Sequence, residues 1–252
     1  GFPDDNFAVD KRRINRMVPV FKEYGLDQVR WGTHTRMDEA DARLKPMAES
    51  GCVYIGFGAE SASERVLTFM NKGGFILRNG LEEVTVNGKK YEVPITMTNA
   101  IRNCHETGIH PNCTWIMGYP GEELQDLKIS TAFILWQQEY WSSFHPAGTE
   151  EHKNALAAVN RKMFTATAYP GTAMWDVVGP QLKKHFNISF DNFGKPVCDE
   201  NFHKYVLELD DATKVLNSLN GEMVNFSDMP LDTFLEAREH VDNDEIEKIL
   251  EM

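Results

Sequence analysis

Segments suited to strands and segments suited to helices alternate along the first two thirds of this chain, and this alternation limits the folds available to it. Residues 10–24 carry apolar side chains at the i, i+3, i+4 and i+7 spacing of an amphipathic helix, which Gly25 can end. Further helices are expected over 39–49, 63–70, 99–107 and 122–140, and strands near 28–33, 52–57, 112–117 and 162–168. Such repetition predicts parallel strands joined by right-handed crossovers, and therefore an α/β barrel or an open α/β sheet.

One segment interrupts the alternation. Residues 83–86 and 89–93 are rich in strand formers, and Asn87-Gly88 between them favours a type I′ turn, so we expect an inserted β-hairpin at about 80–95. Beyond residue 180 the pattern becomes irregular and then helical, near 210–219 and 231–252. The sequence thus predicts an α/β domain over 1–180 and a mainly helical C-terminal extension over 181–252. Pro46 is expected to bend the helix at 39–49.

Composition excludes several classes of protein. The 252 residues are 42% hydrophobic and 25% charged, and they contain no apolar stretch of the ~18 residues that a membrane span needs. Lys and Arg number 26 against 38 Asp and Glu, a formal charge of −12 that argues against general nucleic-acid binding. Four widely separated cysteines, at 52, 104, 113 and 198, match no zinc or iron–sulfur spacing, so no metal ligands are predicted. They are typical of reduced thiols in a cytoplasmic protein.

Polar residues and glycines follow the predicted strands, and functional residues of parallel α/β folds lie at the carboxyl ends of strands. Gly58 and Gly118 would let a ligand approach the backbone closely. Glu60 can accept hydrogen bonds from two ribose hydroxyls, or it can cap the helix that follows. Arg36 can hold a carboxylate, or it can be a solvated surface charge. Near the start of the chain, Asp4 and Asp5 are candidate acids, hydrogen-bond acceptors or turn residues.

These residues together spell a known series of motifs. The run from Gly51 to Gly73, with Gly58-Ala-Glu60-Ser61 at its centre, resembles a segment of radical S-adenosylmethionine enzymes, especially the branch whose members often carry a cobalamin-binding domain. The second-strand, third-strand, fifth-strand and sixth-strand motifs of that family are resembled, in order, by residues 2–7, 31–38, 108–122 and 168–172.

The resemblance implies a TIM-like (β/α)6 barrel, lacking its first βα unit, that holds S-adenosylmethionine over a [4Fe–4S] cluster. An electron from the cluster would cleave S-adenosylmethionine to start radical chemistry, in an oxidoreductase or a methyltransferase of the cobalamin-linked or methylthiotransferase-like kind. By the same resemblance Glu60 and Ser61 would contact the ribose or the amino-acid part, and Arg36 the carboxylate. Gly118, Tyr119 and Pro120 would contact the adenine. The candidates on the substrate side are Asp4, Asp5, Asn6 and Tyr169.

The sequence departs from the family at one decisive motif. The Cys-x3-Cys-x2-Cys loop that holds the cluster is absent, so the chain is expected to be the C-terminal part of a radical enzyme, inactive by itself, whose parent uses S-adenosylmethionine, the cluster and possible cobalamin. Two alternatives remain open: a non-catalytic barrel that binds a nucleoside or a partner, and a conventional hydrolase that uses Asp5, Glu60 and Glu122 as acid and base. The exposed edge of the first strand predicts homo-oligomers, and the substrate is not identified.

Overall fold

The computed structural model of the protein describes residues 1–168, 172–185, 189–190, 192, 196–197 and 225–252. Its strands are β1 (Trp31–Thr35), β2 (Cys52–Glu60), β3 (Leu81–Val86), β4 (Lys89–Pro94), β5 (His110–Met117), β6 (Met163–Thr165), β7 (Ser189–Phe190) and β8 (Pro196–Val197). Its α-helices are α1 (Lys11–Glu23), α2 (Leu44–Glu49), α3 (Glu64–Phe69), α4 (Gly73–Ile76), α5 (Ile95–Thr107), α6 (Leu124–Ser142), α7 (Glu150–Ala157), α8 (Ala173–His185) and α10 (Leu231–Asp242). Short 3-10 turns are η1 (Phe7–Val9), η2 (Leu26–Gln28), η3 (Met37–Glu39) and η4 (Ile246–Leu250). Within the described residues, no helix is both long enough and apolar enough to cross a lipid bilayer.

Strands β1, β2, β5 and β6 form one parallel sheet, in the order β1-β2-β5-β6. Helices separate these strands along the chain, so the predicted α/β alternation with parallel strands is confirmed. The four strands make an open row in the part of the chain that the structure describes. The closed or partly closed barrel therefore stays a prediction.

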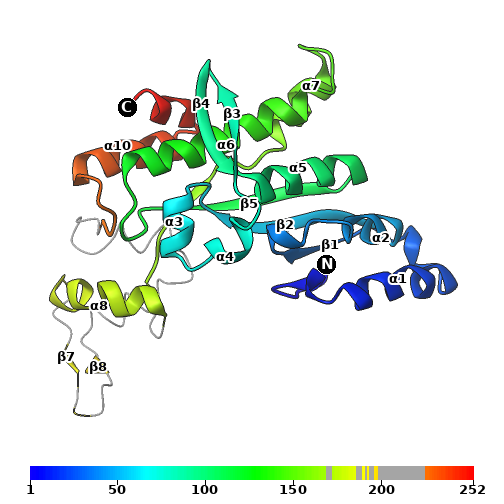
Figure 1. The fold of residues 1–252 in the computed structure, drawn as a ribbon, viewed down its shortest axis with the longest axis horizontal. Helices are drawn as coiled ribbons and strands as arrows, with labels where there is room; N and C mark the ends of the chain where they lie inside the picture. Colours follow the sequence, from blue (N-terminus) through cyan, green and yellow to red (C-terminus); the bar gives the residue numbers. More distant parts are fainter. Residues whose placement is uncertain (169–171, 186–188, 191, 193–195, 198–224) are drawn as a thin grey trace.

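The two faces of the sheet differ in burial. Along β5 every second residue is buried, from Pro111 to Met117, whereas the side chains between them are partly exposed. The buried face packs into one core with α2, α5 and α6, around Phe57, Trp115 and Phe133. Helices α5 and α6 lie together on one side of β2 and β5 (Figure 1). We call the opposite side, which carries His34, Gly56, Gly58 and Thr114, the open face of the sheet.

Residues 2–7, which the resemblance assigned to a strand, do not form one. The N–H of Phe2 donates to the C=O of Gly32 over 2.9 Å, and the Phe2 C=O accepts a hydrogen bond from the Thr33 hydroxyl at 3.2 Å. The pairing stops there because Pro3 has no amide hydrogen and the three residues after it favour turns. This contact covers part of the outer edge of β1, the edge from which we expected homo-oligomers. That expectation stays a prediction.

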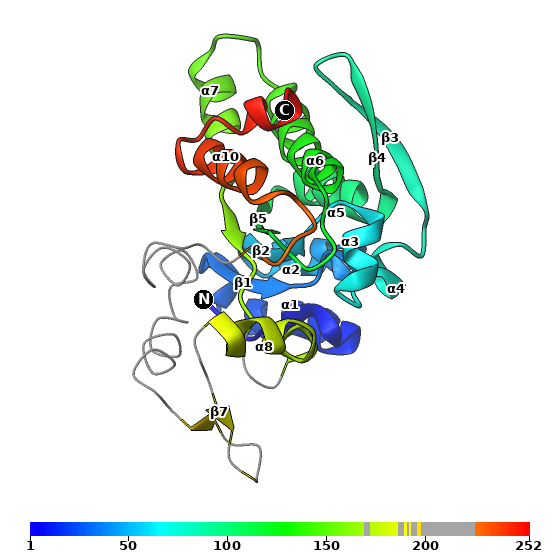
Figure 2. The same cartoon turned by 90° about the vertical axis from the view of Figure 1, so that its left-hand side faces the viewer.

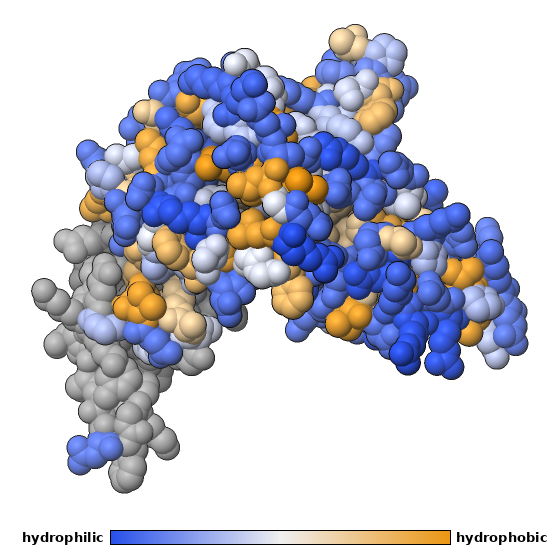
Figure 3. Space-filling view, viewed as in Figure 1, coloured by the Kyte–Doolittle hydropathy of each residue, from blue (hydrophilic) through white to orange (hydrophobic). Residues whose placement is uncertain are grey.

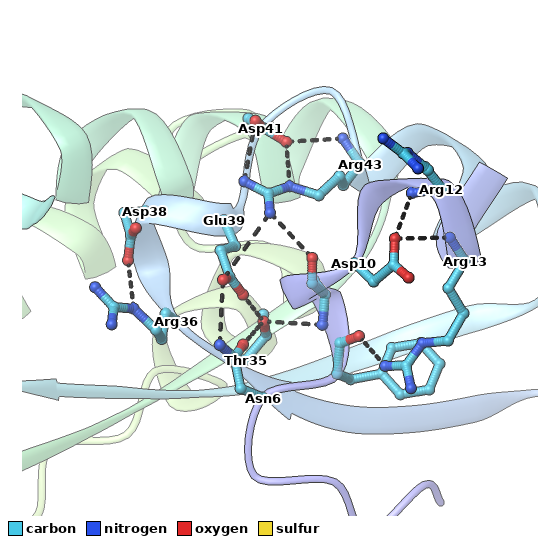
Figure 4. A network of polar contacts seen from close by, with 12 residues as sticks. Asn6, Asp10, Arg12, Arg13, Thr35, Arg36, Asp38, Glu39, Asp41 and Arg43 are labelled. Carbon is cyan, nitrogen blue, oxygen red and sulfur yellow. Dashed lines mark hydrogen bonds and ion pairs between the residues drawn. The ribbon is translucent and has the colours of Figure 1, made fainter.

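A buried polar network ties the start of the chain to the end of β1 (Figure 4). The Thr35 hydroxyl lies 2.8 Å from Asn6 Oδ1 and 2.7 Å from Glu39 Oε2, and it accepts the N–H of Ala8 at 3.3 Å. Asn6 Nδ2 donates to Glu39 Oε1 at 3.1 Å, and an Arg43 guanidinium nitrogen donates to the Ala8 C=O at 3.0 Å. This network fixes the loop that follows β1, where Arg36 lies.

The inserted hairpin is confirmed, as β3 and β4 with a turn at Asn87 and Gly88, whose φ angles are 50° and 72°. It packs against α5 and α6, on their outer side, as Figure 2 shows. Two other expectations needed correction. The helix expected at 39–49 is only α2, and Pro46 lies in its first turn, where it fits without bending the helix. Helix α7 was not expected, although Thr149 caps it.

The C-terminal segment packs onto the same core as the sheet. Phe234 and Ala237 of α10 and Ile249 of η4 are buried in that core, so residues 225–252 cover the sheet and α6. The helix expected over 210–219 lies outside the described residues, as does the rest of 198–224 in the predicted extension. The division of the chain at residue 180 stays a prediction.

We expect Thr35→Val to lower the free energy of unfolding by about 1–3 kcal/mol, because it leaves Asn6, Glu39 and the Ala8 N–H short of a buried partner. Urea denaturation of the variant measures this loss. Thr85→Val is the matched control, since Thr85 is an exposed strand residue of the hairpin. Equal stability of the two variants would show that the network does not anchor the start of the chain.

Candidate functional site

The carboxyl ends of β1, β2 and β5 bring three loops to one edge of the sheet, because these neighbouring strands are parallel. At the starts of these loops lie Arg36, just after β1, Glu60, the last residue of β2, and Gly118, just after β5. All three were selected from the sequence. We call this edge the rim. A recess lies on the lower side of the molecule, between α8 and α1 (Figure 3).

Small residues on the open face of β2 leave room for side chains from elsewhere to lie over the strand. A Cβ added at Gly56 would come within 2.3 Å of the His34 ring, which therefore lies against that glycine. A Cβ added at Gly58 would come within 2.7 Å of Glu60 Oε1 and 3.8 Å of Lys72 Nζ. Near the rim, the open face thus carries the His34 imidazole, which packs on Gly56, and then the Glu60 carboxylate, which packs on Gly58.

Glu60 ends β2 in an unusual conformation. Its φ is 63°, in the left-handed region that residues other than glycine rarely adopt, and the pairing with β5 is irregular between Gly58 and Glu60. This irregularity re-aims the side chain, as bulges at sheet rims commonly do. Glu60 Oε1 accepts a hydrogen bond from Lys72 Nζ at 2.5 Å, and the Glu60 side chain remains 18% exposed. The carboxylate is accordingly folded back over Gly58 and still reachable by a ligand.

Arg36 lies at the end of β1 and is half-exposed. Its Nε donates to Asp38 Oδ1 at 2.8 Å, and its guanidinium lies 4.3 Å from the ring centroid of Phe75. Phe75 belongs to α4 and is itself exposed. An arginine stacked on an aromatic ring and held by one carboxylate keeps other N–H groups for a ligand carboxylate. Arg36 therefore suits the role that the resemblance gave it.

The Ser61 side chain is buried, and its contacts are with other residues of the protein. It is wholly buried, its hydroxyl lies 3.1 Å from the hydroxyl of Ser130 on α6, and it accepts the N–H of Ser63 at 3.1 Å. The Ser63 hydroxyl in turn donates to Asp126 Oδ1 at 2.6 Å. This buried network joins the loop after β2 to the start of α6. The contact of Ser61 with a ribose or amino-acid group stays a prediction, and in this structure its hydroxyl is used within the protein.

The loop after β5 is tightly constrained. Gly118, at φ 81°, donates its N–H to Glu122 Oε2, and a Cβ on Gly118 would come within 2.8 Å of the Phe234 ring of α10. Tyr119 and Pro120 between them are half-buried, and burial raises the pKa of the Tyr119 hydroxyl. The N–H of Gly118 is thus taken up within the loop. A ligand at this loop would meet Tyr119 and Pro120.

Glu122 is a buried acid at the rim. Burial raises the pKa of its carboxyl to about 8, against a usual 4.5, although the Gly118 N–H favours the charged form. Among the described residues its Oε1 has no hydrogen-bond partner. The N–H of Asp228, just before α10, donates to the Glu122 C=O at 2.9 Å. Glu122 therefore connects the loop after β5 to the C-terminal segment.

The candidates on the substrate side are dispersed. Asp4 forms an ion pair with Arg13 at 3.6 Å, and Asp5 is exposed in a turn. Asn6 is held by Thr35 and Glu39. Tyr169 lies outside the described residues. Of these candidates, Asp4 and Asp5 keep exposed side chains, and that of Asp4 is also engaged by Arg13.

The cysteines do not provide a metal site in the described part of the chain. Cys52, Cys104 and Cys113 are free and buried, and burial raises the pKa of all three thiols, to about 12 at Cys52 and Cys113. All three belong to the apolar core, on β2, α5 and β5. No group of three or more Cys, His, Asp or Glu side chains suited to a metal ion occurs among the described residues, and Cys198 lies outside them.

Three further residues lie at the rim, and none of them was given a role from the sequence. Lys72 and Phe75 reach Glu60 and Arg36 from the turn after α3 and from α4, so collecting only residues that directly follow strands misses them. His34 lies within β1, one residue before its end. Alternation along the strand places it on the open face beside Gly56, and that signal was present in the sequence.

Glu122→Gln should make the stability less dependent on pH. The fold favours the protonated acid, so the contribution of Glu122 is fully present below pH 4.5 and is lost as the pH rises toward about 8. Relative to Glu122→Gln, the wild type should lose up to about 1.4 kcal/mol per pH unit across this window. Urea denaturation between pH 5 and pH 8 tests it, with the exposed Glu106 changed to Gln as the control. Parallel curves for wild type and Glu122→Gln would contradict the assignment.

Gly118→Ala should destabilise the protein more than Gly108→Ala. Both glycines have positive φ, 81° and 69°, but a Cβ at Gly108 meets nothing within 4 Å whereas one at Gly118 strikes the Phe234 ring. The shared strain cancels, and the collision should add about 1–3 kcal/mol at Gly118. Thermal denaturation of the two variants gives the difference. A difference near zero would mean that α10 does not pack on this loop.

No known family model matches the chain. An uncharacterized methyltransferase of Pyrococcus horikoshii is 27% identical over 177 residues, which make up 69% of this chain and 30% of that protein. The structure of the cobalamin-dependent S-adenosylmethionine radical enzyme OxsB, without ligands, matches with a TM-score of 0.51 at 14% identity, over 96% of this chain and 33% of that one.

A second solved structure is the radical S-adenosylmethionine methyltransferase TsrM of Kitasatospora setae, with a tryptophan substrate and a S-adenosylmethionine analogue bound. It matches with a TM-score of 0.47 at 14% identity, over 95% of this chain and 39% of that one. The chain thus spans about a third of the length of the relatives that it matches. The predicted resemblance to cobalamin-dependent radical S-adenosylmethionine enzymes is confirmed at the level of the fold.

Proposed function

We propose that the rim binds S-adenosylmethionine and that the chain contributes this site to a cobalamin-dependent radical methyltransferase. The observation that carries the proposal is the Glu60 carboxylate, held over Gly58 on the open face at the carboxyl end of an inner strand. Ligands of parallel α/β folds bind at this end of the sheet. The methyltransferase relative and the likeness to OxsB support the same class of enzyme.

The residues of the rim fit the groups of S-adenosylmethionine. Among the described residues, Glu60 Oε2 makes no hydrogen bond, so it can accept one from a ribose hydroxyl or from the ammonium group. Arg36 can donate to the carboxylate from its stacked position on Phe75. Tyr119 and Pro120 offer a half-buried surface for the adenine ring. Bound S-adenosylmethionine would supply the methyl or 5′-deoxyadenosyl group of the reaction.

The three described cysteines do not fit a [4Fe–4S] cluster, because they are buried in the apolar core and form no group suited to a metal ion among the described residues. Any cluster would need other ligands. Cobalamin enters the proposal only through the relatives. Cleavage of S-adenosylmethionine, and inactivity of this chain by itself, are both parts of the proposal.

The acid–base hydrolase has less support from the rim. Glu122 is wholly buried and its carboxylate oxygen accepts from a backbone N–H of its own loop. Glu60 is engaged by the Lys72 ammonium. Neither group is arranged to exchange a proton with a substrate. A nucleoside-binding protein without catalysis would use the same Glu60. It would differ from the enzyme only in that no reaction follows binding.

Isothermal titration with S-adenosylmethionine tests the proposal on the 252-residue chain. We expect binding by the wild type, and Glu60→Gln should weaken it by about tenfold, because the charged acceptor becomes a neutral amide. Glu64→Gln is the matched control, since Glu64 is exposed on the neighbouring helix α3. Titration with adenosine shows whether the nucleoside part suffices. No binding of either compound by a folded wild-type chain would overturn the proposal.

A further inference from the structure

The ion pair between Glu60 and Lys72 lies at the centre of the proposed site, and no function has been given to Lys72. The two residues are 12 positions apart, and α3 lies between them. Lys72 Nζ contacts Glu60 Oε1 at 2.5 Å and lies 3.8 Å from the point where a Cβ on Gly58 would be. The ammonium, the carboxylate and the glycine therefore form one compact group on the open face.

Stability alone gives little reason for this pair. The Lys72 side chain is 45% exposed, and ion pairs this exposed contribute little to folding. The backbone at Glu60 is in the left-handed region, which is unfavourable for a residue other than glycine. The Glu60 backbone is unfavourable and the ion pair with Lys72 is weak, so the two together add little stability. They are better explained by the position that they give the Glu60 carboxylate.

The geometry shows what that position is. Without Lys72 the Glu60 carboxylate, on a flexible side chain, could extend from the rim into solvent. With Lys72 bound to Oε1, the carboxylate lies over Gly58, and Oε2 is the oxygen left for a ligand. The ammonium also compensates the charge, so a ligand that itself carries a carboxylate is not repelled.

We infer that Lys72 is a positioning residue of the ligand site: its ammonium holds the Glu60 carboxylate over Gly58 so that Oε2 faces the hydroxyl or ammonium group of the ligand. The inference rests on the proposed function. Lys72 acts through Glu60, so its contribution to binding should vanish when Glu60 can no longer be held by charge.

A double-mutant cycle tests this inference. Lys72→Met should weaken binding of S-adenosylmethionine by about five- to tenfold, and Lys72→Arg should restore most of it. In the Glu60→Gln background the same Lys72→Met change should have almost no effect, because there is no longer a charged carboxylate for Lys72 to hold. Adenosine binding, measured on the same variants, should follow the same pattern wherever Glu60 contacts the ribose. Lys45→Met, on the exposed side of α2, is the control.

A second variant tests the same position without removing a charge. Gly58→Ala introduces a Cβ where Glu60 Oε1 lies, and Gly58 does not need a positive φ, so the backbone is not strained. It should weaken binding to the same extent as Lys72→Met while urea denaturation shows a folded protein.

The outcomes separate the inference from the proposed function. A folded wild type that binds no S-adenosylmethionine overturns the proposed function, and the inference with it. A wild type that binds, together with a Lys72→Met variant of equal affinity, overturns the inference alone. Losses that add fully in the double variant overturn it as well, because they mean that Lys72 contacts the ligand by itself.

Discussion

The pairing of β2 with β5 is the interaction on which the candidate site depends. The two strands are in register from Tyr54 and His110 up to the end of β2, where the ladder becomes irregular between Gly58 and Glu60. In a regular strand Glu60 would point away from the sheet on the same face as Gly58. The irregularity and the left-handed φ instead fold its carboxylate back onto that glycine. On the opposing strand Trp115 is wholly buried, so the partner of Glu60 in the ladder is fixed by the core.

The buried hydroxyl network makes this arrangement rigid. Ser61 and Ser63 lie one and three residues after Glu60, and they are held by Ser130 and Asp126 of α6. Buried polar groups are costly unless each has a partner, so these contacts specify one conformation of the loop. The start of α6 is itself fixed by a capping box between Glu123 and Asp126. The end of β2 is consequently held at one side by the ladder and at the other by a helix.

Much of the fold could be predicted because its signals are local. The Asn87-Gly88 turn, the apolar spacing of α1 and the buried run of β2 each lie within a few consecutive residues. The errors came where tertiary contacts decide. Residues 2–7 make one backbone bond to β1 and then turn away, and a motif at that position could not reveal the missing ladder. Similarly, Pro46 fits a first helical turn, and the sequence did not show that α2 begins so late.

The same distinction between local signals and tertiary contacts applies to the candidate site. Arg36, Glu60 and Gly118 could be selected because they follow strands, but Lys72, Ser130 and Phe234 reach them only through the fold. Sequence reasoning could not tell that Ser61 points into the protein, because a ligand contact and a contact with a helix look alike in a motif. The hydroxyl of Ser130, 69 residues further along the chain, is what decides it.

The carboxyl groups of Glu60 and Glu122 lie after neighbouring strands but in opposite environments, so they have different roles at the rim. Glu60 is partly exposed and compensated by an ammonium, which suits it to meet a polar ligand. Glu122 is buried, with its pKa raised by that burial, and it holds the Gly118 N–H. Through its C=O it also binds Asp228, while Phe234 closes the far side of Gly118. The C-terminal segment is therefore part of the support of the loop after β5, and changes in α10 should reach the side of the site that carries Tyr119 and Pro120 before they reach Glu60.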